Sequence, residues 1–502
     1  MNGIVEYFGP NKSNHPCGYC KSNKPDNSSY GVWTHEMTPE QYQIMIDRGM
    51  RRSGKFCYKS VLDKICCPTF AIRCEALNFK PSRSQRKVIK RFNDFIYHGI
   101  KPKSYDKGKN FGKESQTEFI IFGDSQKRLK LAKVEPAESS SSNDLADPVQ
   151  SKPTKSPSTE ATSDNEAVSS TLEPSEIKQC KDRTKKAKYL RLQRRIARIS
   201  LKLNCSEEEA LKVIKEKFQQ RHQKSEKLFE DYFKKPENID KPAHDLRIQF
   251  VSTCTEDHVK YLKVSHQLYE KYQTIIHKDD PSECTIKQFR RFLIDNPFEP
   301  KPFCTESKDS KSIPTSYGSY HMQYWLDDKL IAVAVLDILP YSVSSVYLFY
   351  DPEYSFLSLG TYSALREILL VRNLHEINPS ISYYYLGLYI YNCPKMNYKG
   401  KFHPSFLLCD QALTWHPIEK CLEKLKHHTH PRFEDDPNKV DEDSATIQDD
   451  DILILYSRKI LTYSFYKHLC GTEDSNEVYE YAKLVGKKCT KNFLLYRKNE
   501  ID

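Results

Sequence analysis

The sequence lacks any long apolar run. None of its hydrophobic stretches approaches the length of about 20 residues that a membrane-spanning helix needs. The start, MNGIVEYFGPNKSNHPC, also lacks the apolar centre of a signal peptide. Hydrophobic residues make up only 38% of the 502 residues, and the mean hydropathy is −0.70. We therefore expect a protein with no membrane partner, located in the cytoplasm and perhaps also in the nucleus.

Internal repeats and a secretory signal are also missing. Without a secretory signal, the 16 cysteines predict reduced thiols or metal ligands rather than disulfides. The 78 Lys and Arg residues exceed the 67 Asp and Glu residues, which gives a net charge of +11. Such a surplus is compatible with a polyanionic partner, although many basic faces are simply solvated. The length suggests two or three domains.

The most informative stretch lies between residues 317 and 402. Alternating large and β-branched residues predict four strands, with a helix before the last one: strands 317–326, 330–339, 343–350 and 382–391, and helix 361–373. A glycine-bearing turn precedes this helix, where backbone N–H groups can face an anion. This order of elements predicts an α+β or α/β fold with a GNAT-like acyltransferase domain.

Two close cysteine pairs characterise the first part of the chain. Cys17 and Cys20 form a C-x-x-C knuckle, and Cys66 and Cys67 are adjacent. Four such sulfurs suit either a tetrahedral zinc ion or an iron–sulfur cluster, and the spacing does not choose between them. The alternative is that these thiols bind nothing, with Cys66 and Cys67 packed in a core.

Composition divides the rest of the chain. A segment rich in Ser, Thr, Pro and acidic residues predicts a disordered linker, because it has too few apolar groups to offset the entropy of ordering. A basic segment with helical spacing follows it. The expected parts are a small cysteine-containing N-terminal domain at 1–135, the linker at 136–177, the basic helical segment at 178–240, the GNAT-like domain at 241–435, an acidic loop at 436–452 and a helical tail at 453–502.

Several long strings of the sequence resemble a known family. YGSYHMQY, VLDILP, SSVYLFYDPEYSFLSLGTYSALRE and NCPKMNYKGKFHPSFLLC resemble the carboxy-terminal domain of eukaryotic arginyl-tRNA–protein transferases, and GYC and ICCP resemble the amino-terminal domain. The resemblance implies an enzyme that uses arginyl-tRNA as co-substrate and tRNA(Arg) as partner. It implies transfer of arginine to the α-amine of proteins that begin with Asp, Glu or oxidised Cys, which marks them for ubiquitin-dependent degradation. We expect a monomer.

The chemistry of this transfer suggests the catalytic residues. Asp337 and His321 are candidates for the base or for the anchor of the attacking amine, and Gly360 lies where backbone N–H groups could hold the oxyanion. Alternatively, a ribose hydroxyl of the tRNA relays the proton, and no side-chain base is needed.

Recognition of the side-chain carboxylate of an acidic acceptor requires cations, preferably a guanidinium. Arg366 is the first candidate, and Lys395, Lys399 and Lys401 follow on a predicted basic loop. Tyr317, Ser319, Tyr320, Ser358 and Tyr362 could line the same cleft. The guanidinium of the transferred arginine could be read by Glu367 or Asp351. Contacts to tRNA phosphates are expected from two basic helices, through Arg86, Lys90, Arg191, Arg194 and Arg195.

Two other functions are compatible with parts of the sequence. A coenzyme A-dependent N-acetyltransferase normally carries a glycine-rich phosphate loop, but here the bulky Tyr362 follows Gly360 where a small residue is expected. A non-catalytic adaptor with a zinc domain would bind tRNA and leave it charged.

Overall fold

The computed structural model describes residues 2–13, 17, 19–20, 27–102, 174–223, 227–303, 313–471 and 473–498. The chain forms two compact units, one of residues 1–133 and 229–502 and the other of residues 134–228. This division differs from the expected one, because the predicted N-terminal domain and the predicted transferase domain belong to the same unit.

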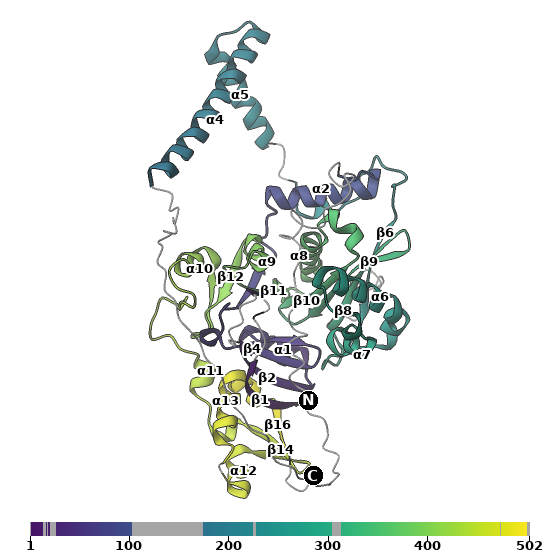
Figure 1. Ribbon diagram of the computed structural model, residues 1–502, viewed down its shortest axis with the longest axis vertical. Coiled ribbons are helices and arrows are strands. Elements are labelled where there is room, and N and C mark those ends of the chain that lie inside the picture. The colour runs from purple at the N-terminus through teal and green to yellow at the C-terminus, as the bar shows by residue number, and fades with distance from the viewer. Residues whose placement is uncertain are drawn as a thin grey trace, which may run out of the picture. The chain divides into compact units, whose positions relative to one another are not determined.

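The first sheet of the larger unit joins both ends of the chain. Its strand order is β15-β14-β16-β1-β2-β4-β3. The strands are β1 (Gly3–Ser13), β2 (Asn27–Glu36), β3 (Arg51–Ser53), β4 (Phe56–Ser60), β14 (Leu453–Tyr456), β15 (Lys459–Thr462) and β16 (Phe493–Arg497). Strand β16 pairs in parallel with β1, so the strands at the two ends of the colour scale lie side by side in Figure 1.

The sequence predicts a helical tail at 453–502, but this part of the chain is not purely helical. It contains three strands of the first sheet beside α12 (Tyr463–Cys470), α13 (Ser475–Val485) and α14 (Lys487–Thr490). The predicted acidic loop before it also contains two helical turns, α11 (Glu442–Ala445) and η9 (Asp449–Asp451). Strands of four or five residues are too short to show a clear alternation, which explains the error.

The second sheet has the order β13-β12-β5-β11-β10-β9-β8-β6, and β7 pairs with β8. The strands are β5 (Phe70–Glu75), β6 (Leu246–Ser252), β7 (Lys301–Pro302), β8 (Ser316–Leu326), β9 (Lys329–Ile338), β10 (Ser342–Tyr350), β11 (Tyr383–Tyr389), β12 (Ser405–Leu408) and β13 (Trp415–Pro417). The four strands predicted between residues 317 and 391 are confirmed. Strands β10 and β11 are parallel, and their pairing covers only Ser342–Ser344 and Tyr383–Tyr385.

Strand β5 explains why the N-terminal residues do not form a separate domain. It lies between β11 and β12 and is antiparallel to both. The chain thus supplies β1 to β4 to the first sheet and β5 to the second. A boundary between the two sheets cannot be drawn at one place in the sequence.

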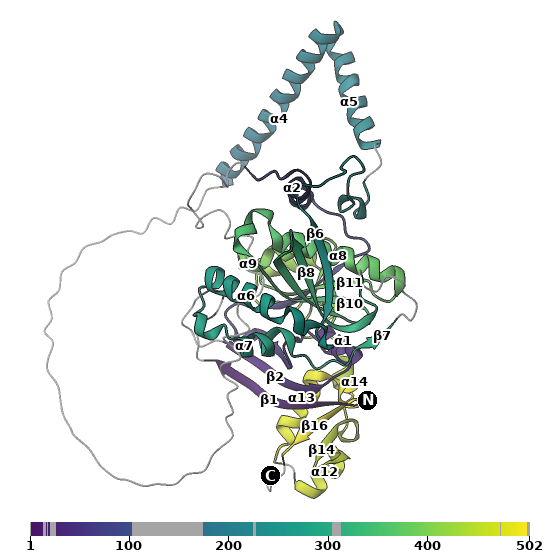
Figure 2. The same ribbon diagram turned by 90° about the vertical axis from the view of Figure 1, so that its right-hand side faces the viewer.

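Helices cover the second sheet. Helix α8 (Leu359–Ile377) packs on β10 and β11, and α6 (Leu262–Tyr272) packs on β9 and β10 (Figure 2). Helix α2 (Arg83–His98) packs in turn on α8. Capping boxes open α1 (Pro39–Asp47) at Thr38 and α2 at Ser82. The remaining helices are α7 (Ile286–Phe289), α9 (Pro394–Asn397) and α10 (Ile418–Leu425).

Short helical turns connect these elements. They are η1 (Leu62–Lys64), η2 (Glu230–Tyr232), η3 (Glu256–Tyr261), η5 (Pro281–Glu283), η7 (Pro352–Leu357) and η8 (Tyr398–Lys401), and two π-helical turns, η4 (Gln273–His277) and η6 (Arg290–Ile294). The predicted basic loop after β11 is in fact helical, since α9 and η8 follow each other there. None of the helices in the described part of the chain combines the length and the apolar character that crossing a membrane requires.

The smaller unit is a pair of helices. Helix α4 (Pro174–Leu203) and α5 (Glu207–Gln223) meet through Ile196, Ala210 and Ile214. On α4, Ile196 and Ile199 contribute to this contact, whereas Leu192 and Leu203 are exposed. The helical prediction is correct, but its bounds shift: α4 begins inside the predicted linker, and residues 229–240 belong to the larger unit. The rest of the linker lies outside the described residues.

Candidate functional site

The four predicted cysteine ligands come together. The sulfur atoms of Cys17, Cys20, Cys66 and Cys67 all lie within 4.8 Å of one another, and those of Cys20 and Cys66 are 3.5 Å apart. Burial, together with hydrogen bonds from its neighbours' thiols, raises the pKa of Cys66 to about 12. Four thiols around one point suit a metal centre, because bound metal replaces the thiol protons and neutralises the thiolates.

This cysteine cluster contacts the chain that leaves β11. Tyr19 and Cys67 pack against a small buried group formed by Ile390, Cys393 and Met396. The segment from Cys66 continues through Pro68 directly into Thr69 and β5. The cluster therefore fixes both the start of β5 and the turn into α9.

The turn before α8 keeps the shape that the sequence predicts for an anion site. Ser358 adopts a left-handed conformation with φ of 53°, and its side chain does not cap the helix. Gly360 is buried in the first turn of α8. The guanidinium of Arg91, from α2, donates to the Ser358 hydroxyl at 2.9 Å and to the Phe356 carbonyl at 3.2 Å. A helix N-terminus and a guanidinium together concentrate positive potential at this turn.

The residues that follow on α8 lie in packed surroundings. The ring of Tyr362 is fully buried and stacks on Phe92 at 3.6 Å. Its hydroxyl accepts a hydrogen bond from Arg366 Nε at 2.9 Å. The Arg366 guanidinium lies 4.6 Å from the centre of the Phe233 ring. Arg366 is therefore engaged by two aromatic residues rather than aimed into a pocket with the lysines.

Asp337 and His321 lie in the core rather than in a cleft. Asp337 is completely buried and accepts two hydrogen bonds from Arg52, at 2.7 and 2.5 Å. Burial lowers the pKa of His321 to about 4, and its Nε2 lies 3.0 Å from the Leu293 carbonyl. A carboxylate held by a guanidinium and a neutral buried imidazole are both poorly suited to take a proton from an incoming amine.

The other expected lining residues of β8 are also occupied. Ser319 is buried, and its hydroxyl accepts a hydrogen bond from Arg52 at 2.9 Å. The hydroxyl of Tyr320 donates to the Ser316 carbonyl at 3.0 Å. The hydroxyl of Tyr317 accepts from Asn378 at 2.7 Å. Their hydrogen bonds hold the start of β8 in place.

The two acidic residues expected to read the transferred arginine are likewise engaged. Asp351 is buried and forms ion pairs with Lys271 at 2.7 Å and Lys329 at 2.8 Å. Glu367 is fully buried and accepts hydrogen bonds from Tyr384 and Ser363, both at 2.7 Å. Burial raises the pKa of Glu367. Neither carboxylate offers an open site.

The three lysines after β11 differ from one another. Lys401 is exposed and Lys395 half-buried, but Lys399 is buried and donates to the Leu388 carbonyl at 2.9 Å. Burial, reinforced by the nearby charge of Arg51, lowers the pKa of Lys399 to about 7. The three lysines therefore do not converge as expected. The charge that acts on Lys399 belongs to another buried cation.

That cation is Arg51 on β3, which the sequence reasoning missed. Within the described residues, its guanidinium donates to the backbone carbonyls of Ile46, Met50 and Gly387, and it lies 5.7 Å from the centre of the Tyr385 ring. Its Nε is buried without a partner among the described residues, and burial lowers its pKa. The available signal was the run Arg51-Arg52 inside a strand-like segment, since successive strand residues face opposite sides and both were unlikely to reach water.

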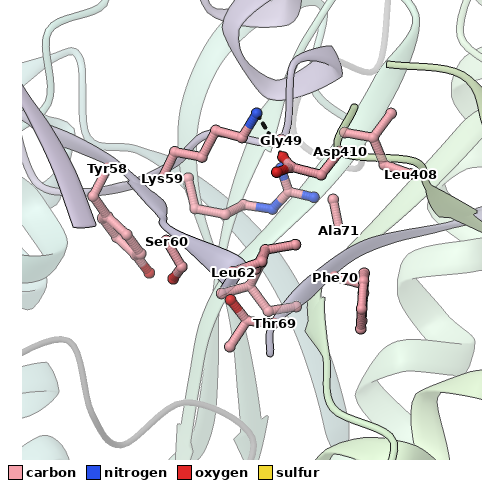
Figure 3. Close-up of a pocket in the computed structure, with 12 residues that line it drawn as sticks. Gly49, Tyr58, Lys59, Ser60, Leu62, Thr69, Phe70, Ala71, Leu408 and Asp410 are labelled. Atoms are coloured by element: carbon pink, nitrogen blue, oxygen red, sulfur yellow. Dashed lines mark ion pairs between the residues drawn. The ribbon is translucent and has the colours of Figure 1, made fainter. Parts of the chain in front are cut away.

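Arg51 lines a pocket to which residues of both sheets contribute. The pocket is drawn in Figure 3, where Lys59 and Asp410 face each other near the upper end. Their ion pair measures 2.8 Å. The lining comprises Gly49, Arg51, Tyr58, Lys59, Ser60, Leu62, Thr69, Phe70, Ala71, Leu388, Leu408 and Asp410.

The residues expected to contact tRNA phosphates are on the surface. Arg86 and Lys90 are exposed on α2, where Lys90 pairs with Asp94 at 2.7 Å. Arg191, Arg194 and Arg195 are exposed on α4 of the smaller unit. Exposure is what phosphate contact requires, but a solvated basic face shows it equally.

Comparison with known proteins gives the same family from both ends of the chain. Residues 15–87 match the profile of the arginine-tRNA-protein transferase N terminus, and residues 264–409 match that of the C terminus. Arginyl-tRNA–protein transferase 1 of Drosophila melanogaster is 36% identical over 511 residues, which covers 98% of this chain and 99% of that protein. Arginyl-tRNA–protein transferase 2 of Arabidopsis thaliana is 31% identical and covers 83% of this chain and 75% of that protein.

A bacterial relative shares part of the chain. The aspartate/glutamate leucyltransferase of Acinetobacter baylyi is 31% identical over 183 residues, which is 36% of this chain and 56% of that protein. All these relatives are named as enzymes that transfer an amino acid, which defines the class of this protein as an aminoacyltransferase. Within that class the chain belongs to the arginyl-tRNA–protein transferase family, and it transfers arginine from arginyl-tRNA to proteins.

Proposed function

We propose that this enzyme arginylates the amino-terminal α-amine of proteins that begin with Asp, Glu or oxidised Cys, and thereby marks them for ubiquitin-dependent degradation. The observation that carries the choice of acceptor is the likeness to bacterial transferases named for aspartate and glutamate. The enzyme acts as a monomer in the cytoplasm and also in the nucleus, for which the basic helix α4 is a suitable import signal.

The transfer proceeds on a GNAT-like core made of β8, β9, β10, α8 and β11. The nitrogen of the acceptor amine attacks the ester carbonyl of arginyl-tRNA, a C–N bond forms, and the bond to the ribose oxygen breaks. Because an ester is exchanged for an amide, this step needs no further ATP. The short parallel pairing of β10 and β11, which does not continue beyond Ser344 and Tyr385, supports this assignment.

Positive potential at the turn before α8 stabilises the developing oxyanion or holds the end of the tRNA. The backbone N–H groups near Gly360 and the Arg91 guanidinium supply it. With Asp337 and His321 in the core, the ribose hydroxyl of the tRNA is the better candidate for relaying the proton of the amine. The basic faces of α2 and α4 bind the tRNA backbone through Arg86, Lys90, Arg191, Arg194 and Arg195.

Cys17, Cys20, Cys66 and Cys67 hold a metal centre. A zinc–sulfur bond of about 2.3 Å places the sulfurs of a tetrahedron about 3.8 Å apart, which is compatible with sulfurs that all lie within 4.8 Å. The same thiolates, spread farther apart, would bind an iron–sulfur cluster. A zinc ion would brace the local fold, and a cluster would add sensitivity to oxidation. Metal analysis and the visible spectrum of anaerobically purified protein distinguish the two.

The test of the proposed acceptor specificity uses purified protein, arginyl-tRNA with labelled arginine, and peptides that differ only in their first residue. Asp and Glu peptides should acquire label, and an Ala peptide should not. Equal labelling of all three would overturn the proposed specificity, and label that stays on the tRNA would show that transfer itself fails.

A further inference from the structure

The pocket beside Arg51 contains three buried donors that have no partner among the described residues. They are Arg51 Nε, Ser60 Oγ and Thr69 Oγ1. Each residue is more than nine-tenths buried, and all three line the same pocket. Figure 3 shows Ser60 and Thr69 on its lower side. A buried polar group without a hydrogen bond is costly, so several of them around one space indicate a ligand that completes them.

The charge of the pocket indicates an anion. Arg51 and Lys59 face a single carboxylate in the lining, that of Asp410, and Asp410 is paired with Lys59. Asp47, which acts on Arg51 from a greater distance, is itself bound by Tyr385 and Gln43. Arg51 therefore has no carboxylate partner of its own in the described structure. A buried guanidinium ordinarily has such a partner, because an uncompensated charge in the interior is unfavourable.

The shape of the pocket favours a carboxylate on a short stem over a phosphate of a polynucleotide. Its deepest groups, Arg51, Ser60 and Thr69, are more buried than Lys59 and Asp410, which are partly exposed. A phosphate flanked by two sugars needs an open groove, whereas a single side chain can pass beside the Lys59–Asp410 pair. Two hydroxyls and a guanidinium edge are donors, and a carboxylate is purely an acceptor.

The pocket also lies beside the strand that borders the transfer site. Arg51 binds the carbonyl of Gly387, and Leu388 lines the pocket. Both belong to β11, just beyond the point where its pairing with β10 ends. A side chain anchored here would leave the α-amine of the same residue close to the point where the β10–β11 pairing ends.

We propose that Arg51, Ser60 and Thr69 form the subsite that binds the side-chain carboxylate of the acceptor's first residue. This inference rests on the proposed acidic acceptors. Before binding, the Lys59–Asp410 ion pair covers the subsite. On binding, the substrate carboxylate takes the three donors.

The hydroxyls permit a clean test, because removing a hydroxyl without a protein partner removes no hydrogen bond of the fold. We would compare Ser60→Ala and Thr69→Val in the full chain, with Ser265→Ala as matched control. Ser265 also has a buried hydroxyl without a partner among the described residues, but it lies on α6 and does not line the pocket. KM is measured for an Asp peptide and for arginyl-tRNA, together with Tm.

Each pocket variant should raise KM for the Asp peptide at least ten-fold, as expected for the loss of a hydrogen bond to a charged group. KM for arginyl-tRNA and Tm should stay unchanged, and the control should match the wild type throughout. Arg51→Gln should in addition remove the preference for Asp over Asn peptides. Because Arg51 also holds three backbone carbonyls, the decision rests on the hydroxyl variants.

Two results would overturn the subsite. One is a KM for the Asp peptide within two-fold of wild type in both hydroxyl variants, and the other is an increase in KM for arginyl-tRNA instead, which would assign the pocket to the nucleic acid. Failure of the proposed acceptor specificity looks different, since the wild-type enzyme itself would then not distinguish Asp from Ala peptides.

Discussion

Arg51 and Arg52 are neighbours on β3, and both are buried, but their surroundings differ. Arg52 forms a bidentate ion pair with Asp337 and also donates to Ser319 and to the Gly54 carbonyl. Arg51 donates to three backbone carbonyls, lies over the Tyr385 ring and has no carboxylate partner among the described residues, and it borders a pocket with unpartnered donors. Burial of a charge does not by itself reveal its role. The partners do: a compensated pair joins β3 to β9, and an uncompensated cation is available to a substrate.

The largest effect should come from breaking the compensated pair. Arg52→Met or Asp337→Leu alone leaves an unpaired buried charge, which typically costs 3–5 kcal/mol, so we expect a loss of about 3–5 kcal/mol in the free energy of unfolding. The double variant should recover much of this loss, because neither charge remains. Urea unfolding measures all three. Single variants that unfold within about 1 kcal/mol of wild type would show that the pair is not what holds β3 to β9.

A second effect should appear at the pocket beside Arg51 and not at the Arg52–Asp337 ion pair. Thr69 follows Cys67 closely, so Cys67→Ser, by removing one ligand of the proposed metal centre, should loosen the wall of the pocket that Leu62 and Thr69 provide. We expect KM for an Asp peptide to rise about ten-fold, the scale of one lost hydrogen bond to a charged group. The control is Cys470→Ser, an exposed cysteine outside the cluster. Metal loss with an unchanged peptide KM would contradict this coupling.

A third effect concerns Lys399, a buried lysine on which the charge of Arg51 acts. Burial and the Arg51 charge lower its pKa to about 7, whereas an unfolded lysine titrates near 10.4. Between these values the unfolded chain binds more protons, so the free energy of unfolding should rise with pH from about 7 to about 10. Lys399→Met should lose this rise while keeping the rest of the pH profile. Tm measured against pH in both proteins checks it, and parallel profiles would show that Lys399 is not desolvated.

The smallest effect is expected at Arg366, although the sequence made it the first candidate for reading the acidic acceptor. Its guanidinium packs on Phe233 and binds the Tyr362 hydroxyl. Arg366→Ala should therefore cost about 0.5–1 kcal/mol of stability, the value of an exposed cation–π contact. KM for the Asp peptide should stay within two-fold of wild type. A ten-fold increase would return the acceptor site to Arg366 and weaken the case for Arg51.

The sequence predicted local structure better than long-range pairing. Strands β8, β9 and β10 and helix α8 are all correct, because alternation and helical spacing act over a few residues. The placement of β5 between β11 and β12 was not foreseen, and neither was the pairing of β16 with β1. Such pairings join residues hundreds of positions apart, and no local pattern in a single sequence identifies the partner of a strand.

The same limit applies to the site. The two cysteine pairs could be assigned to one metal site from the sequence, because the cysteines of each pair are close together and such motifs commonly bind metals. Asp337 seemed free, since its partner Arg52 lies 285 residues earlier, and Lys399 seemed exposed because its segment reads as a basic loop. Arg51 attracted no attention, because a guanidinium becomes informative only when its lack of a carboxylate can be seen.

The central claim is that the pocket beside Arg51 binds the acidic side chain of the acceptor. The most direct measurement is an experimental structure of the full chain with a peptide that begins with Asp. The account predicts the side-chain carboxylate within hydrogen-bond distance of Arg51 Nε, Ser60 Oγ and Thr69 Oγ1, with the α-amine near the end of the β10–β11 pairing. A carboxylate bound at Arg366, or at Lys395 and Lys401, with the Arg51 pocket unchanged, would contradict it.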